Sequence, residues 1–262
     1  MTVTDPRAIA ETCRWHRALG RVVIDTGQAR LVIDRTHPNV WDANCADTVT
    51  AATEGAIAGV LAAMDRYLGH GDWRVVYSDP FTPEPFMARL ALDGFVEQPA
   101  TIQMALCGDV PAEPADDLHP VDDEDDWRAL AELVARDHDE GRRTDGLKLS
   151  RAVTDGIVAG YRAKAPGFRF HLARVGGAAV AYGGMGIGPG RTGIIDDLFT
   201  LPSHRGRGIA SGIIAAFARR MREEGCATVF LGALVGERAR LLYAGLNFRP
   251  VMLTRRWVRP MR

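Results

Sequence analysis

The segment 194–210 constrains the fold of this 262-residue chain more than any other stretch. It begins with an apolar run that contains Asp196 and Asp197 and predicts a strand. Pro202 then turns the chain, and a loop rich in Arg and Gly opens directly into an apolar helix expected over 209–224. Glycines offer no side chains to a core, so we interpret the loop as a ligand site between a strand and a helix. An ordinary glycine-rich connection is the alternative.

The Arg/Gly loop predicts a cradle for a pyrophosphate group. Gly206 and Gly208 allow the backbone to approach a ligand closely. The first N–H groups of the following helix have no partner within the helix, and the helix dipole attracts negative charge to them. Arg205 and Arg207 add positive charge. The cradle has no Walker lysine.

Residues downstream of the loop complete a known pattern. A second helix contains Tyr243 and is followed by Phe-Arg-Pro at 248–250. In the loop, Arg205-x-x-Gly208-x-Ala210 matches the Arg/Gln-x-x-Gly-x-Gly/Ala signature of acyl-CoA binding. With these motifs the second half of the chain resembles the GNAT superfamily of acetyl-CoA-dependent N-acetyltransferases. Together the motifs are specific for the superfamily, but they do not name a substrate.

The resemblance implies an α/β (α+β) GNAT fold, in which helices flank a mixed central sheet. It also implies acetyl-CoA as a co-substrate. The residues that it assigns to cofactor binding are Leu198, Phe199, Thr200, Arg205, Gly206, Arg207, Gly208, Ile209 and Ala210. One departure from the family is Gly236, which stands where an Asn often contacts the pantetheine.

Acetyl transfer to an amine requires a base, because a lysine-like amine with a pKa of about 10.4 costs about 4–5 kcal/mol to deprotonate at pH 7. By likeness to the Glu-Asp pair of spermidine/spermine acetyltransferase, we expect Asp196 to be the base and Asp197 to contact the substrate. Strand alternation would point them to opposite faces, unless the bulge common in this family intervenes. Alternatively, one of them pairs with an arginine. Tyr243 matches the family tyrosine that protonates the departing CoA thiolate.

The acidic segment 137–143 lies between the first two expected helices of the second half, which often line the acceptor site in this family. Asp137, His138 and Glu140 are therefore candidates for binding a cationic acceptor. A solvated charged loop is the alternative. The expected partner is a small-molecule or peptide amine. Since no cysteine lies in a nucleophile setting, we expect direct attack in a ternary complex; an acyl-CoA sensor or a transferase for longer acyl groups remain competing hypotheses.

The first half repeats the order of the second without its cofactor loop. Its strands are expected at 21–25, 29–34, 40–49, 73–78 and 100–106, with one helix at 54–68 and a second that ends in Phe95. When Phe95 is aligned with Phe248, Leu90 falls on Tyr243, and the loop position holds 50–55 with no Arg. This weak repeat predicts two tandem GNAT-like units, an arrangement that resembles mycothiol synthase. The expected units are a degenerate domain at 1–108 without a cofactor site, a linker at 109–117 and a catalytic domain at 118–262.

The composition favours a soluble, cytoplasmic protein. Its net charge of -1 lacks the basic excess typical of nucleic-acid binding. No apolar run approaches the length of a membrane span, and the polar N-terminus has no signal-peptide core. The four cysteines and seven histidines are scattered, which indicates neither a disulfide framework nor a metal site. A homodimer is left open.

Overall fold

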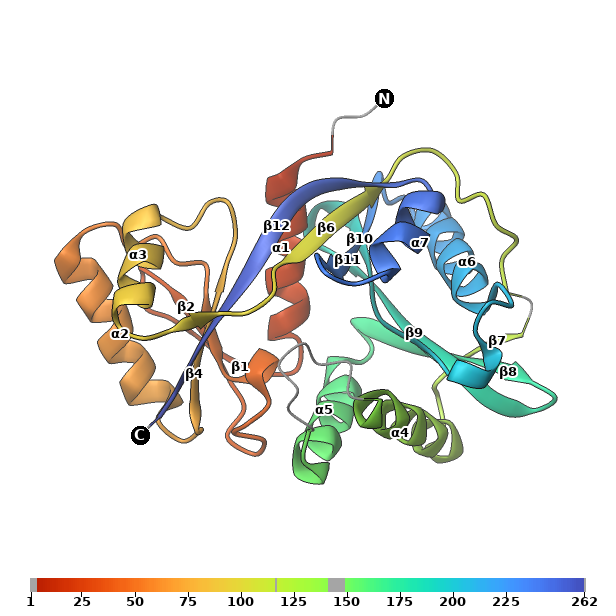
Figure 1. Ribbon diagram of the computed structural model, residues 1–262, viewed down its shortest axis with the longest axis horizontal. Helices are drawn as coiled ribbons and strands as arrows, with labels where there is room; N and C mark the ends of the chain where they lie inside the picture. The colour runs from red at the N-terminus through yellow and green to blue at the C-terminus, as the bar shows by residue number, and fades with distance from the viewer. Residues whose placement is uncertain (1–3, 116, 141–148, 262) are drawn as a thin grey trace.

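The structure is a computed structural model that describes residues 4–115, 117–140 and 149–261. A single sheet of twelve strands runs through the molecule, and helices cover both of its faces (Figure 1). The strand order is β1-β2-β3-β4-β12-β6-β11-β10-β9-β8-β7, with β5 paired to β12. A mixed sheet flanked by helices confirms the predicted α/β (α+β) class.

The elements follow the order expected from the sequence, with additions at both ends. The first half contains α1 (Pro6–Ala18), β1 (Val22–Asp25), β2 (Arg30–Ile33), β3 (Cys45–Asp47), α2 (Glu54–Leu68), β4 (Trp73–Ser78), α3 (Glu84–Leu92), β5 (Val96–Glu97) and β6 (Thr101–Leu106). The second half contains β7 (Leu118–Pro120), α4 (Glu124–Asp139), α5 (Arg151–Lys164), β8 (Phe168–Val175), β9 (Ala178–Gly188), β10 (Thr192–Thr200), α6 (Ile209–Glu223), β11 (Thr228–Leu234), α7 (Ala239–Gly245) and β12 (Phe248–Pro260).

Most helices begin at a side chain that occupies one of their free N–H groups. Asp123 starts α4 by accepting from the Asp126 N–H at 2.8 Å. Thr53 starts α2 by accepting from the Ala56 N–H at 3.4 Å. The helix α6 differs, because its N-cap is Gly208, which offers no side chain to cap it. The first turn of α6 therefore keeps donors for another partner.

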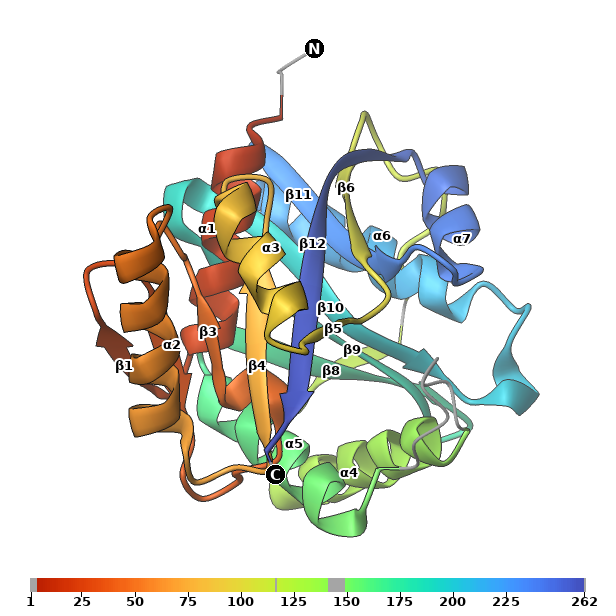
Figure 2. The same ribbon diagram turned by 60° about the vertical axis from the view of Figure 1, so that its left-hand side comes forward.

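The two halves are joined by an exchange of their last strands. β6 belongs to the first half, yet it pairs with β11 of the second. β12 starts beside β6 with residues 248–254 and continues beside β4 with residues 255–260. Each half thus completes the sheet of the other, and Figure 2 shows β12 running between β4 and β6. The predicted border at 108 divides the chain but does not divide the sheet.

The predicted internal repeat appears in the order of elements around this exchange. The series β3-α2-β4-α3 corresponds to β10-α6-β11-α7. β3 pairs in parallel with β4, as β10 does with β11. The aligned residues Phe95 and Phe248 are both buried, and so are Leu90 and Tyr243. The first half therefore keeps the packing positions of the second.

The N-terminal helix α1 is not among the elements expected from the sequence. Asp5 caps it by accepting from the Arg7 N–H at 2.8 Å, and Pro6 occupies its first turn. Although α1 belongs to the first half, it packs on β9 and β10 of the second, and Ile9 and Ala10 are buried there. The helix thereby reaches the strand that carries the two aspartates.

Two smaller segments also differ from the sequence-based picture. The strand expected at 40–49 is shorter, because a 3-10 turn over Trp41–Ala43 precedes β3. The described part of the linker 109–117 is packed along α6, where the Ala115 N–H donates to the Gly212 carbonyl at 3.1 Å.

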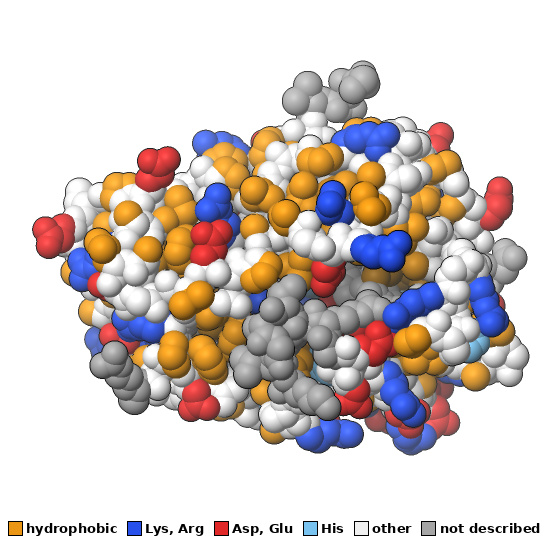
Figure 3. Space-filling model, in the orientation of Figure 1, with side chains coloured by type: hydrophobic (Ala, Val, Ile, Leu, Met, Phe, Trp, Pro, Cys, Tyr) orange, Lys and Arg blue, Asp and Glu red, His pale blue; other side chains and the backbone are white. Residues whose placement is uncertain are grey.

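The surface mixes charges of both signs. Lys and Arg side chains are interspersed with Asp and Glu over the face shown in Figure 3. Within the described ranges, no helix is both long and apolar enough to span a membrane.

Candidate active site

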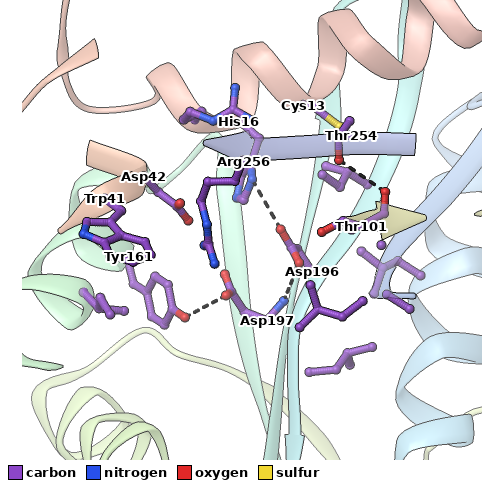
Figure 4. Close-up of a pocket in the computed structure, with 18 of the residues that line it drawn as sticks. Cys13, His16, Trp41, Asp42, Thr101, Tyr161, Asp196, Asp197, Thr254 and Arg256 are labelled. Atoms are coloured by element: carbon purple, nitrogen blue, oxygen red, sulfur yellow. Dashed lines mark hydrogen bonds and ion pairs between the residues drawn. The ribbon is translucent and has the colours of Figure 1, made fainter. Parts of the chain in front are cut away.

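A β-bulge in β10 brings the two predicted catalytic carboxylates to one cavity. β10 pairs regularly with β9 as far as Asp196 opposite Gly184, and the pairing resumes at Phe199 opposite Tyr182. Within the bulge Asp197 has a φ of 55°, a left-handed conformation that is uncommon for residues other than glycine. Both aspartates consequently line the same cavity (Figure 4). The bulge overrides the strand alternation, as the resemblance implied.

The cavity has a volume of about 460 Å³ and lies where the two halves meet. The second half contributes, among others, Asp196, Asp197, Leu198, Tyr161, Lys164 and Tyr243. The first half contributes, among others, Cys13, His16, Arg17, Trp41, Asp42 and Tyr77. Because β12 crosses between the halves, it also brings Arg256 to the wall. The cavity is therefore a joint product of both halves.

Asp196 is held in surroundings that suit a base. Burial within the protein and the charge of Asp197 raise the pKa of Asp196 to about 7. Nevertheless 46% of its side chain is open to the cavity, so a substrate can reach it. Its Oδ1 accepts from the Asp197 N–H at 3.0 Å, which fixes the carboxylate across the bulge. A carboxylate that titrates near neutral pH is well matched to accept a proton.

Asp197 has a different set of contacts. The Tyr161 hydroxyl donates to its Oδ1 at 2.8 Å. Burial raises the pKa of Asp197, while the Lys164 ammonium and this hydrogen bond oppose the rise. The hydroxyl stabilises the ionised carboxylate, and in that form Asp197 can attract a cation.

Tyr243 faces the same cavity from α7. Its side chain is buried, and its ring lies 6.5 Å from that of Phe248. Burial and the nearby charge of Asp196 raise the pKa of the Tyr243 phenol. The hydroxyl is therefore protonated at neutral pH and can donate a proton.

The loop before α6 has the geometry of an anion site. Gly206 and Gly208 have φ angles of 74° and 81°, and a Cβ built at either would meet no atom within 4 Å. The uncapped N–H groups of Ile209 and Ala210 begin α6 beside them. Arg207 is exposed at the same edge. These residues fit a phosphate group through backbone donors rather than through a lysine.

Arg205 has partners other than the expected phosphate. Its Nη2 contacts both carboxylate oxygens of Glu140 at 2.9 and 2.8 Å. Its Nε donates to the carbonyl of Thr200 at 2.9 Å, and its backbone N–H donates to the carbonyl of Pro202 at 3.3 Å. Arg205 therefore links Glu140, at the C-terminal end of α4, to Thr200 at the end of β10. Because its own N–H is occupied, the backbone donors predicted to bind an anion begin at Gly206.

Some of the other predicted cofactor and acceptor residues line the cavity, and the rest are buried or paired elsewhere. Leu198 lines the cavity, whereas Phe199 and Thr200 are buried at the end of β10. In the acceptor segment, Asp137 and His138 reach the cavity, where Asp137 accepts from the Tyr182 hydroxyl at 3.3 Å. His138 Nδ1 lies 2.8 Å from the Thr154 hydroxyl. Glu140 is held by Arg205, and positions 141–143 lie outside the described residues.

The comparison with protein families decides the assignment of the second half. Residues 127–248 match the model of the acetyltransferase (GNAT) family. The matched segment is a GNAT acetyltransferase domain. The match contains the bulged strand, the glycine loop and α7. No curated protein matches the sequence.

Solved structures share the fold over most of the chain at low sequence identity. A GCN5-related N-acetyltransferase from Kribbella flavida is 17% identical with a TM-score of 0.67, and 96% of each chain is covered. A putative GNAT-family acetyltransferase from Novosphingobium aromaticivorans is 20% identical with a TM-score of 0.59, over 97% of this chain and 99% of that one. A tandem GNAT protein from the clavulanic acid biosynthesis pathway is 16% identical with a TM-score of 0.59, over 88% and 78%. The GNAT fold and its tandem form are thus both represented.

Several residues of the GNAT site are not apparent from the sequence. His16 lies on α1, and its Nδ1 approaches Asp196 Oδ2 to 3.7 Å. Lys164 ends α5, and Tyr161 on the same helix holds Asp197. Only Lys164 carries a signal in the sequence, since it is one of very few lysines in a chain whose basic residues are nearly all Arg.

Three possible metal ligands also meet in the cavity. One donor atom each from His16, Asp196 and Asp197 lie within 4.8 Å of one another. The Lys164 Nζ, however, lies 3.0 Å from His16 Nε2 and close to both carboxylates. Burial lowers the pKa of Lys164, and in its ammonium form the side chain supplies positive charge beside this group. The absence of a metal from the reaction stays a prediction.

Proposed function

We propose that this protein transfers an acetyl group from acetyl-CoA to a primary amine by direct attack in a ternary complex. The observation that carries the proposal is the convergence of Asp196, Asp197 and Tyr243 on one cavity, at the end of the strand that leads into the uncapped helix α6. A proton acceptor and a proton donor thus line one cavity, and the strand that carries the acceptor leads into the loop predicted to bind an anion. The GNAT domain supports acetyl transfer as the reaction class.

The loop would hold the pyrophosphate of acetyl-CoA. Gly206, Gly208 and the first amides of α6 fit this role because they present backbone donors and leave open space where a side chain would stand. The corresponding helix of the first half, α2, is capped by Thr53 instead. We therefore expect one cofactor site in each chain.

Asp196 would accept the proton of the acceptor ammonium. Deprotonating a lysine-like amine at pH 7 costs about 4–5 kcal/mol, so a base is required. The open face of Asp196 and its raised pKa suit this step. Asp197, whose Oδ1 accepts from the Tyr161 hydroxyl, would attract the ammonium and orient it. Tyr243 would donate its phenolic proton to the thiolate as the acetyl group leaves it.

The proposal is tested with purified protein, acetyl-CoA and a panel of amines. The panel should include polyamines, aminoglycosides, amino acids and peptides with free N-termini, with thiol release and product mass as readouts. Acetylated product with at least one class supports the proposal. CoA binding without turnover on the whole panel would favour a sensor. Faster turnover with propionyl- or longer acyl-CoA donors would favour a different acyl group.

A further inference from the structure

Lys164, His16 and Asp196 are successive neighbours in the wall of the cavity. The Lys164 Nζ lies 3.0 Å from His16 Nε2, and His16 Nδ1 lies 3.7 Å from Asp196 Oδ2. The residues come from three elements, α5, α1 and β10. Lys164 and His16 are only 6% and 7% exposed, so their contact is shielded from water. Figure 4 shows the His16 side chain pointing toward Asp196.

The chemistry of the three groups fixes the direction of their hydrogen atoms. Burial lowers the pKa of Lys164, whereas the charges of Asp197 and Asp196 oppose this shift. In its ammonium form Lys164 can only donate, so Nε2 of His16 accepts from it. The hydrogen of the neutral imidazole then sits on Nδ1, which faces Asp196. Burial and the charges of Lys164 and Arg17 lower the pKa of His16 well below its usual value, so the ring is neutral.

We propose that His16 and Lys164 are positioning residues for Asp196. Lys164 fixes the tautomer of His16, and His16 turns the positive end of its Nδ1–H bond toward the carboxylate that receives the amine proton. The inference rests on the proposed function, in which Asp196 is the base. It gives α1, an element of the half without a cofactor loop, a part in the reaction.

The charges around these three residues make Lys164 the main cation near Asp196. The titratable or charged groups that surround Asp196, His16 and Lys164 in the cavity are Cys13, Arg17, Arg21, Asp42, Tyr161, Asp197, Tyr243 and, on β12, Arg256. The acidic groups Asp42 and Asp197 raise the pKa of Asp196, whereas Lys164 lowers it. Removing the Lys164 charge should therefore raise this pKa further.

Lys164→Met tests the inference, because it removes the charge and keeps an unbranched side chain. The matched control is Arg162→Met on the same helix, since Arg162 pairs with Glu124 outside the cavity. Carboxyl ¹³C NMR titration of full-length protein, assigned with Asp196→Asn, measures the Asp196 pKa. An opposite charge nearby shifts a carboxyl pKa by roughly 1–3 units, so we expect a rise of about one unit in Lys164→Met and no change in the control. Lys164→Arg should restore the wild-type value.

The kinetic readout is the pH profile of kcat. In Lys164→Met the acidic limb should move up by about one unit, with kcat about tenfold lower at pH 6, near wild type at pH 9 and an unchanged KM for acetyl-CoA. If no amine is acetylated by wild-type protein, the proposed function fails, and the NMR titration still decides the positioning role. If Lys164→Met does not fold, His16→Leu must raise the Asp196 pKa. If the Asp196 pKa is unchanged in the folded variant, the inference is overturned. A rate that depends on added divalent metal and is abolished by a chelator would also overturn it.

Discussion

Gly208→Val should separate cofactor binding from protein stability. Gly208 has a φ of 81° and begins α6, and a Cβ there would meet no protein atom within 4 Å. A valine is therefore not excluded by packing, but it must adopt a left-handed conformation that costs about 1–3 kcal/mol. Its branches would also occupy the open space in front of the helix amides. The backbone strain and the blocked amides thus both result from placing a side chain on the Cα of residue 208.

The expected loss of affinity can be worked from the number of contacts. If the pyrophosphate accepts two charge-assisted hydrogen bonds from the first amides of α6, at about 1.5 kcal/mol each, their loss costs about 3 kcal/mol. Since about 1.4 kcal/mol is a factor of ten, Kd for CoA should rise about 100-fold. Isothermal titration calorimetry measures this change directly.

Gly190→Val is the matched control. Gly190 has a φ of 64°, and a Cβ there would likewise meet no atom within 4 Å, but it lies between β9 and β10 rather than at a helix start. Both variants should lose a similar free energy of unfolding in urea, and only Gly208→Val should lose CoA affinity. Equal CoA affinity in the two variants would show that the pyrophosphate does not lie on α6.

Further predictions concern the catalytic groups and the exchanged strand. Asp196→Asn should lower kcat most at neutral pH. Its kcat should recover partly at alkaline pH, where more of the amine is already neutral. If Asp197→Asn shows this recovery instead, Asp197 is the base and Asp196 contacts the substrate. In the folded protein the pKa of Asp196 is raised to about 7, so ionisation of this carboxyl destabilises the folded state as the pH rises from about 4 to 7. Asp196→Asn removes this ionisation. The variant should therefore have a higher free energy of unfolding than wild type at pH 8 and the same one at pH 4. The gain should be about 1–2 kcal/mol, since the half-open side chain is partly screened by solvent. Tyr243→Phe should reduce kcat and leave Kd for CoA nearly unchanged, and a loss confined to Kd would argue against the proton donor role. Trp257→Ala on β12 should cost about 3–5 kcal/mol and unfold both halves in one transition, because Trp257 packs in the first half's core; two separate transitions would contradict the shared sheet.

Local signals predicted most of the secondary structure. The bounds of α2 and β4 agree with the expected 54–68 and 73–78, because Thr53 caps one and a run of buried residues forms the other. The glycine loop and α6 were also predicted in place, since glycine and helix amphipathicity are features of neighbouring residues. These elements depend on contacts between residues that are close together in the sequence.

The exchange of β6 and β12 could not be predicted in this way. A strand with alternating buried residues has the same pattern whichever neighbour it pairs with, and Ser78 meets Arg255 from the opposite half of the chain. The site has the same limit: the Asp pair and Tyr243 belong to motifs, whereas His16 and Lys164 are single residues brought together by tertiary packing. The bulge at Asp197 was implied by the family resemblance and not by any residue pattern.

The exchanged strands have a consequence for how the protein is made. During synthesis β4 leaves the ribosome early, but its partner residues 255–260 are translated only after every other element described here. Until then one edge of β4 has unpaired N–H and C=O groups, a surface that other chains can pair with. Contacts so distant in sequence also slow folding. We therefore expect the nascent first half to depend on chaperones or on low expression temperature, and the final strand to act as the closing step for both cores.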